Sequence, residues 1–100
     1  MPKIYEYFGL IFFFYSDEHE PIHIHVSKAE RETVFEIIME NGELKELRVR
    51  KKGKKMPLTD SEQNTADKFI RVYLTDILKK WTNFFVWKKK IRATKITKKI

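Results

Sequence analysis

Cysteine is absent from this 100-residue chain, which therefore has no disulfide framework and no thiolate metal site. Any metal ion would have to be bound by nitrogen and oxygen atoms. Long apolar runs are also lacking, since the longest, residues 10–15, is far shorter than the roughly 20 residues that a membrane-spanning helix needs. Asp17, Glu18 and Glu20 stand where the cleavage site of a signal peptide would be expected. We therefore expect a cytoplasmic protein that makes no membrane contact.

Acidic and basic side chains are unevenly distributed around a net charge of +7. Residues 1–47 hold 4 basic and 10 acidic side chains, whereas residues 48–55 hold 6 basic and none acidic. Residues 88–100 hold 7 basic and none acidic, and without them the chain would be formally neutral. We expect one α+β domain over residues 1–87, large enough for a single core, and a basic, flexible tail over residues 88–100.

The first half of the chain has the pattern of a β-sheet. Residues 3–8 and 10–16 are rich in aromatic and β-branched residues, and the continuous run LIFFFY indicates a strand that is covered on both faces. A third strand is predicted from Pro21, a fourth over residues 32–39 and a fifth over residues 44–50. Asn41 and Gly42, between the last two strands, are a residue pair typical of a type I′ hairpin turn.

The second half has the pattern of a helix that begins near residue 60. Thr59 and Glu62 have the spacing of a capping box, and apolar residues then recur at the helical period for six turns. Two i,i+4 ion pairs are predicted on its exposed side, Asp67–Arg71 and Asp76–Lys80. The β-branched residues within 72–75 leave open whether the helix is continuous.

These elements predict an α+β fold. An antiparallel sheet of four to five strands, residues 3–50, would carry a C-terminal helix or kinked helix pair, residues 60–87, on one face. In the stretch EHEPIHIHV, His23 and His25 alternate with isoleucine and valine. Because successive side chains of a strand point to opposite faces, we expect the apolar residues in the core and both imidazoles on the opposite, more exposed face.

The stretch Phe12 to Val26 resembles the signature of a family of small bacterial proteins catalogued as a domain of unknown function. Its members have the motif E-H-x-P-x-H-x-H-V and a C-terminal helix that ends in a tryptophan and phenylalanine cluster, which ILKKWTNFF matches. The resemblance covers about residues 1–86 and places the motif on Glu18, His19, Pro21, His23 and His25. It implies a small cognate protein partner in a toxin–antitoxin-like two-protein module. Members commonly end near the aromatic cluster, and this chain departs from the family pattern in its KKGKK loop and its basic tail. Any function of these basic segments would therefore be specific to this protein.

One hypothesis for the histidine cluster is a site for zinc or another divalent metal. Imidazoles two residues apart on one strand face have Cα atoms about 6.6 Å apart. His23 and His25 could therefore share an ion, with Glu18 or His19 supplying a third ligand and a fourth position left for water.

A second hypothesis is metal-free chemistry on a phosphodiester bond. His23 and His25 could share proton removal and proton donation, and Arg48 or Arg50 could stabilise the developing negative charge. A third hypothesis gives the histidines no chemistry. They would then be structural residues or contacts in a protein-interaction module. Glu36, in an otherwise apolar strand, is predicted either to support an imidazole or to face water.

The basic loop is a further candidate site. Arg48, Arg50, Lys51, Lys52, Lys54 and Lys55 could bind a nucleic-acid backbone. No aromatic residue lies within this run, so we expect non-specific affinity and no recognition of base sequence. The alternative is a solvated loop and a solubilising tail. The aromatic residues near the end of the helix are expected in the core, with Trp87 left over for a partner.

Overall fold

The computed structural model describes residues 3–14, 22–51 and 53–100. Glu18, His19, Pro21 and Lys52 therefore lie outside the described residues. Within them the elements follow in the order β1 (Lys3–Tyr7), β2 (Leu10–Phe13), β3 (Ile22–Lys28), β4 (Arg31–Glu40), β5 (Glu43–Lys51), α1 (Asp60–Val72), α2 (Leu74–Trp81), the π-helical turn η1 (Thr82–Val86) and β6 (Thr94–Ile96).

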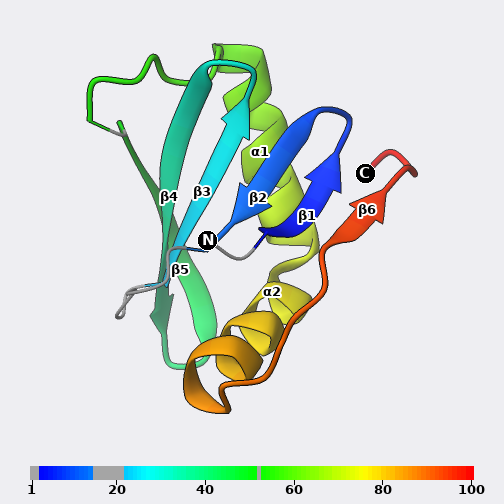
Figure 1. Ribbon diagram of the computed structural model, residues 1–100. Coiled ribbons are helices and arrows are strands. Elements are labelled where there is room, and N and C mark those ends of the chain that lie inside the picture. Colours follow the sequence, from blue (N-terminus) through cyan, green and yellow to red (C-terminus); the bar gives the residue numbers. More distant parts are fainter. Residues whose placement is uncertain (1–2, 15–21, 52) are drawn as a thin grey trace.

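The strands form one sheet in the order β5-β4-β3-β2-β1-β6. The strands β1 to β5 pair antiparallel with their neighbours in sequence, and β6 pairs parallel with β1. The helices α1 and α2 pack on one face of this sheet (Figure 1). The predicted α+β class is confirmed, with one strand more than expected. No helix among the described residues is long and apolar enough to cross a membrane.

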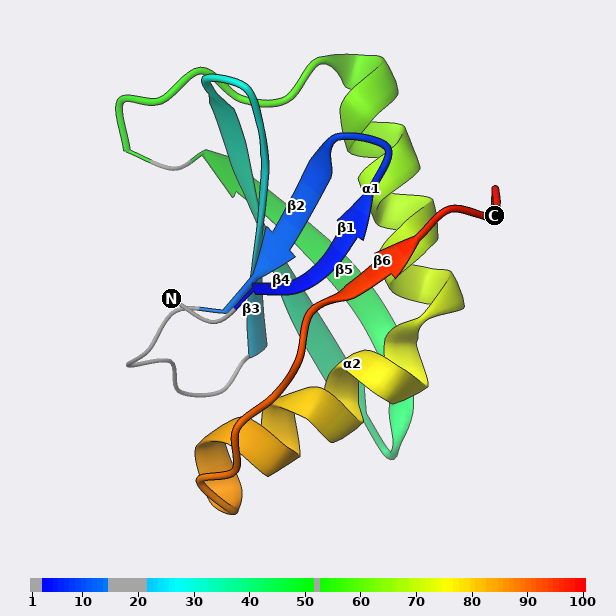
Figure 2. The ribbon, with the colours of Figure 1, turned by 45° about the vertical axis from the view of Figure 1, so that its right-hand side comes forward.

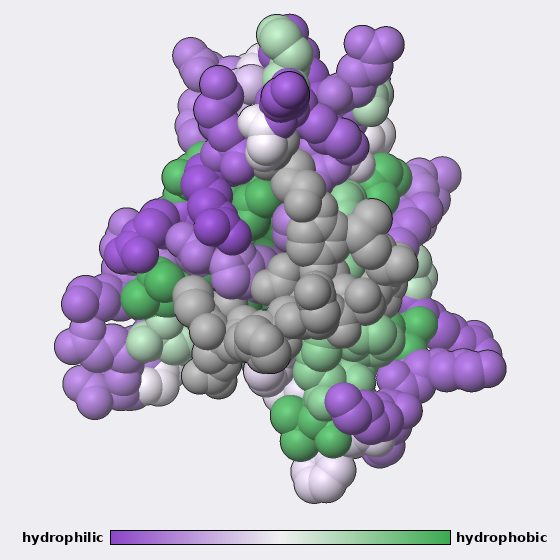
Figure 3. Space-filling view, turned by 60° about the vertical axis from the view of Figure 1, so that its left-hand side comes forward, coloured by the Kyte–Doolittle hydropathy of each residue, from purple (hydrophilic) through white to green (hydrophobic). Residues whose placement is uncertain are grey.

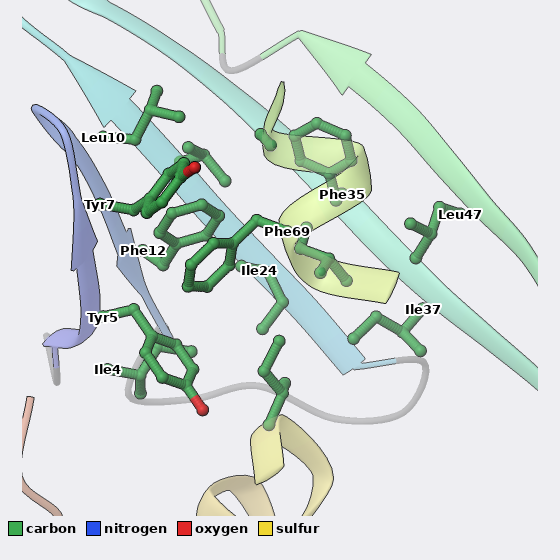
Figure 4. Close-up of a cluster of buried hydrophobic side chains, with 14 of the residues drawn as sticks. Ile4, Tyr5, Tyr7, Leu10, Phe12, Ile24, Phe35, Ile37, Leu47 and Phe69 are labelled. Atoms are coloured by element: carbon green, nitrogen blue, oxygen red, sulfur yellow. The ribbon is translucent and has the colours of Figure 1, made fainter. Parts of the chain in front are cut away.

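The hydrophobic core lies between the helices and the sheet face that they cover. Phe69 of α1 is fully buried at its centre. Its ring centroid lies 4.6 Å from that of Phe12 and 4.5 Å from that of Tyr73, and the rings of Tyr5 and Tyr7 lie 5.1 and 5.0 Å away. Figure 4 shows the rings of Phe69, Phe12, Tyr5 and Tyr7 beside the aliphatic side chains of β3, β4 and β5. The core therefore joins the first strands of the chain to its C-terminal half.

Two hairpin turns have the positive φ angles that type I′ geometry demands. Asn41 and Gly42 join β4 to β5 with φ of 53° and 80°, as the sequence predicts. Phe8 and Gly9 join β1 to β2 with φ of 45° and 88°. The strands predicted over residues 3–8 and 10–16 place a connection at Gly9, but a phenylalanine rarely adopts such a conformation, so the position of Phe8 within the turn was not predicted.

The helical half begins at the predicted cap and is divided into two helices. The Thr59 hydroxyl accepts a hydrogen bond from the Glu62 N–H, and the Glu62 carboxylate accepts one from the Thr59 N–H, which confirms the capping box. Tyr73 has φ of −102° and ψ of 18°, outside the helical region, and it separates α1 from α2. The helix is therefore not continuous, and it breaks within the β-branched stretch.

One of the two predicted helical ion pairs is present. Arg71 binds Asp67 at 2.7 Å. The predicted Asp76–Lys80 pair is wrong, because both side chains have tertiary partners. Asp76 accepts a hydrogen bond from the Tyr5 hydroxyl, and Lys80 donates to the Arg92 carbonyl oxygen at 2.8 Å. Burial, reinforced by the hydrogen bond to Asp76, raises the pKa of the Tyr5 phenol far above its usual range.

The C-terminal segment contributes to the sheet and to the core. Residues 94–96, expected within a tail outside the domain, form β6 at the free edge of β1 (Figure 2). Ile91, Ile96 and Ile100 pack against the core, and the Ile100 N–H donates to the Tyr7 hydroxyl at 3.2 Å. The basic side chains of this segment, including Lys95, remain exposed. The domain therefore extends beyond the boundary expected at residue 87.

The capping box gives a prediction for stability and its pH dependence. Hydrogen bonds from the Thr59 backbone and side chain hold the pKa of Glu62 below its usual value. A carboxylate with a lowered folded pKa stabilises the protein above its unfolded pKa of 4.5 and loses that effect as the pH falls through the folded pKa. Thr59→Ala should lower the free energy of unfolding by about 1 kcal/mol at pH 7.

Glu62→Gln is the matched variant, because glutamine keeps the hydrogen bond of the box and removes the titrating group. Urea unfolding followed by circular dichroism at several pH values from 7 to 3 compares the three proteins. We expect the wild type to lose more stability than Glu62→Gln between pH 5 and 3. Parallel pH profiles for the two would contradict the assignment.

Candidate functional site

His23 and His25 lie on the sheet face opposite to α1 and α2. The apolar residues that alternate with them along β3, Ile22, Ile24 and Val26, are part of the core, so the alternation predicted from the sequence is confirmed. In the register of β3 and β4, Glu36 is opposite His23 and Val34 is opposite His25. Side chains of directly opposed residues share a sheet face. Both histidines therefore meet the side chains of β4 on this face, which we call the histidine face.

His23 forms a pair with Glu36 across the two strands. Its Nε2 lies 2.8 Å from the Glu36 carboxylate, and each side chain is 13% exposed. With the proton on Nε2, the ring donates to the carboxylate, which fixes the orientation of the imidazole. The hypothesis that Glu36 supports an imidazole is confirmed. Carboxylate–imidazole pairs of this kind orient histidines both in acid–base catalysis and in metal sites.

His25 forms a second pair, with Glu32 on the diagonal of the same ladder. Its Nδ1 lies 3.1 Å from one carboxylate oxygen of Glu32, and the Lys55 ammonium lies 3.1 Å from the other. The His25 ring also stacks on Phe13 of β2, with centroids 5.4 Å apart. The Glu32 carboxylate is thus held between an imidazole and an ammonium group, which compensates its burial.

The expectation that the histidine face is exposed is wrong for His25. Its side chain is only 2% exposed, and its neighbours Val34 and Phe13 are buried as well. Among the described residues, Phe13 of β2 stacks on the His25 ring, and Val34 and Glu32 of β4 lie beside it on the same face. His23 is the more accessible of the two imidazoles. A role that needs contact with a large ligand therefore suits His23 better than His25.

Arg48 and Arg50 lie on the histidine face one strand further out. Arg48 is opposite Glu36, and Arg50 is opposite Val34. His23, Glu36 and Arg48 therefore form one row across β3, β4 and β5. Strands are spaced by about 4.8 Å, so the Cα atoms of His23 and Arg48 lie about 10 Å apart. Both arginines are exposed at the edge of the sheet.

The exposed cations of β5 and the following loop lie along one edge of the sheet and its end. We define the basic edge as Arg48, Arg50, Lys51, Lys54 and Lys55, all of them exposed. Arg48 lies 3.4 Å from Glu46, and Lys55 is bound to Glu32. Among the described residues the other three take part in no ion pair. Hydrophilic side chains cover the end of the molecule at which this loop lies, the upper end of Figure 3.

The structure leaves the metal hypothesis as a prediction. Within residues 3–14, 22–51 and 53–100, no three histidine, aspartate or glutamate side chains come together so that they could hold a metal ion. Two of the proposed ligands, Glu18 and His19, lie outside these ranges. His23 and His25 each have a different glutamate partner and use different ring nitrogens toward it.

Glu32 and Phe8 are the residues of interest that sequence reasoning missed. Glu32, Val34 and Glu36 alternate along β4 in the pattern E-x-V-x-E, so their side chains point to the same face of the sheet. This spacing could have placed Glu32 on the histidine face. Phe8 gave no local signal, because only the tight β1–β2 connection reveals its exposure.

Taken together, these features define a small α+β protein with a mixed sheet, helices on one face and two histidine–glutamate pairs on the other. Residues 9–82 match the domain of unknown function DUF4160, and the chain belongs to that family. The match ends at the start of η1, so the segment that forms β6 lies beyond it. No curated protein and no solved structure matches the chain.

Proposed function

We propose that this protein is the nucleic-acid-binding component of a toxin–antitoxin-like two-protein module and that its basic edge contacts the phosphate backbone of RNA. In this proposal the histidine–glutamate pairs are structural, and they hold β3 and β4 in register beneath the arginines. A small cognate protein is the expected partner. The resemblance to a family with a two-protein gene arrangement supports the partner, and the surface charge supports the ligand.

The observation that carries the proposal is the basic edge itself. Five exposed cations lie on one strand and its loop, and two of them, Arg48 and Arg50, project from the same sheet face. Lysine and arginine side chains that contact phosphates release counterions, which makes the affinity depend on salt. The paired and largely buried state of His23 and His25 supports a structural role more strongly than a catalytic one.

The test is the salt dependence of RNA binding. We expect the protein to bind a fluorescein-labelled RNA in an anisotropy titration, with an affinity that falls as the salt concentration rises. Arg48→Gln/Arg50→Gln should weaken binding and lower the salt slope by about 1.4, because each lost contact to a single strand removes about 0.7.

The matched control is Lys68→Gln/Lys79→Gln, which removes the same charge from the helices α1 and α2. Equal losses in the two double variants would show a general effect of net charge and would overturn the assignment to the basic edge. Wild-type protein that binds no RNA at low salt would refute the proposal as a whole.

A second candidate function is cleavage of RNA without a metal, which the row His23, Glu36 and Arg48 favours. His23 would remove the proton from the ribose 2′-hydroxyl as that oxygen attacks the phosphorus, and would return it to the 5′-oxygen that leaves. Glu36 would orient the imidazole ring, and Arg48 would stabilise negative charge on the phosphate. Incubation of total RNA with purified protein in EDTA tests it. Cleavage that His23→Ala abolishes would support this function, and cleavage that His23→Ala leaves unchanged would come from a contaminant.

A further inference from the structure

Two hollows lie side by side at the end of the sheet where α1 begins. The first, of about 260 Å³, lies between the β1–β2 turn, the first turns of α1 and the C-terminal end of the chain, and it is lined by residues that include Phe8, Lys28, Glu62 and Lys99. The second, of about 410 Å³, shares Lys28 and Glu62 with it. Figures 1 and 2 show the turns, the loop after β5 and the start of α1 at this same end.

The second hollow connects the first with the basic edge. It is lined by Arg31 and Met56 in addition to the shared residues. Met56 directly follows Lys55, and its carbonyl oxygen accepts a hydrogen bond from the Glu32 N–H at 2.9 Å. Arg31 donates to the Pro57 carbonyl oxygen at 3.0 Å, which holds the loop against the β3–β4 turn. The hollows therefore continue from the basic loop around the end of the sheet to Phe8.

Phe8 presents an aromatic ring at the far end of this path. Its φ of 45° is a conformation that a phenylalanine adopts at a cost, and its side chain is 54% exposed. The ring meets Tyr7 edge to face, with centroids 4.8 Å apart, so Tyr7 supports it from one side. An exposed, supported ring in a strained turn is a feature that the fold itself does not require.

The charges along the path favour an anionic ligand. Three cations, Lys28, Arg31 and Lys99, line the two hollows, against the two carboxylates of Glu30 and Glu62. The Glu62 carboxylate already accepts the hydrogen bond from the Thr59 N–H and lies 3.9 Å from the Lys28 ammonium. The remaining positive charge suits phosphates that follow each other along a chain.

We propose that the two hollows are the path of a single-stranded nucleic acid, with one unpaired base stacked on Phe8 and the backbone near Lys99, Lys28 and Arg31. This inference rests on the proposed function and names its ligand as single-stranded. A base can stack on an exposed ring only when its face is free, as in an unpaired strand. The first hollow, of about 260 Å³, lies slightly below the usual size range of ligand sites, which suits a single base.

The experiment compares Phe8→Leu with Phe8→Tyr in anisotropy titrations against a labelled eight-nucleotide RNA and against a duplex of the same sequence. Leucine removes the aromatic face, whereas tyrosine keeps it. Loss of one base–aromatic stack should weaken binding of the single strand roughly five- to a hundredfold in Phe8→Leu. Phe8→Tyr should bind like the wild type, and the salt slope should stay unchanged because no phosphate contact is lost.

The outcomes separate this inference from the proposed function. If Phe8→Leu binds the single strand as well as the wild type while Arg48→Gln/Arg50→Gln still lowers the salt slope, the Phe8 site is refuted and the basic edge stands. Equal wild-type affinity for the single strand and the duplex would also refute it. Trp87→Leu is the control, since Trp87 is a 64% exposed aromatic residue far along the chain. If Trp87→Leu lost more affinity for the single strand than Phe8→Leu, the base would stack on Trp87 and the Phe8 site would be refuted.

Discussion

Phe69→Ala should cost this protein about 3–5 kcal/mol of unfolding free energy, the range measured for large-to-small changes of buried aromatic residues. The Phe69 ring is fully buried and meets the rings of Tyr5, Tyr7, Phe12 and Tyr73. These four rings belong to β1, to β2 and to the residue that ends α1. They are therefore held in place and cannot all move to fill the cavity that alanine would leave. Since small domains are stable by about 5–15 kcal/mol, the variant should be marginally folded at 25 °C.

Urea unfolding followed by far-UV circular dichroism measures the effect, with Phe84→Ala as the matched control. Phe84 lies in η1, is only partly buried and contacts the ring of Phe85 edge to face at 4.7 Å. Its loss should cost less than about 1.5 kcal/mol. If the two variants lost the same stability, Phe69 would not be the centre of the core.

Local patterns in the sequence were sufficient to predict most of the fold. The turn at Asn41 and Gly42, the cap at Thr59 and the alternation of β3 depend on neighbouring residues, whose spacing the sequence shows directly. The break at Tyr73 falls within the β-branched stretch that made a continuous helix doubtful. The sixth strand was missed because three residues among lysines have no strand pattern, and only the free edge of β1 selects them.

Tertiary contacts decided what the sequence could not show. Asp76 and Lys80 have the spacing of an ion pair, yet Tyr5 and the Arg92 backbone lie closer to them in the fold. At the site, alternation predicted that His23 points away from the core, but the choice for Glu36 between supporting an imidazole and facing water was decided by the register of β3 and β4. The burial of His25 depends on Phe13, which comes from another strand, and no spacing within β3 encodes that neighbour.

Glu32→Ala should be the most destabilising change on the histidine face, with an expected loss of about 3–5 kcal/mol. The Glu32 side chain is 4% exposed, and its carboxylate compensates both His25 and Lys55. Alanine would leave a buried imidazole without this partner and an emptied space beside it. Lys55→Ala should cost less than about 1 kcal/mol, because the Lys55 side chain is 58% exposed and its ion pair is screened by water.

The double variant His25→Phe/Glu32→Leu tests whether the pair acts only in the structure. Replacement of both members of a buried pair by apolar groups of similar shape is often nearly neutral, so the double variant should be more stable than Glu32→Ala in the same urea titration. It should also bind RNA with wild-type affinity, since the basic edge is unchanged apart from the partner of Lys55. A double variant that folds normally but no longer binds RNA would show that the pair takes part in function, and the structural role that we assign to the histidines would then be wrong.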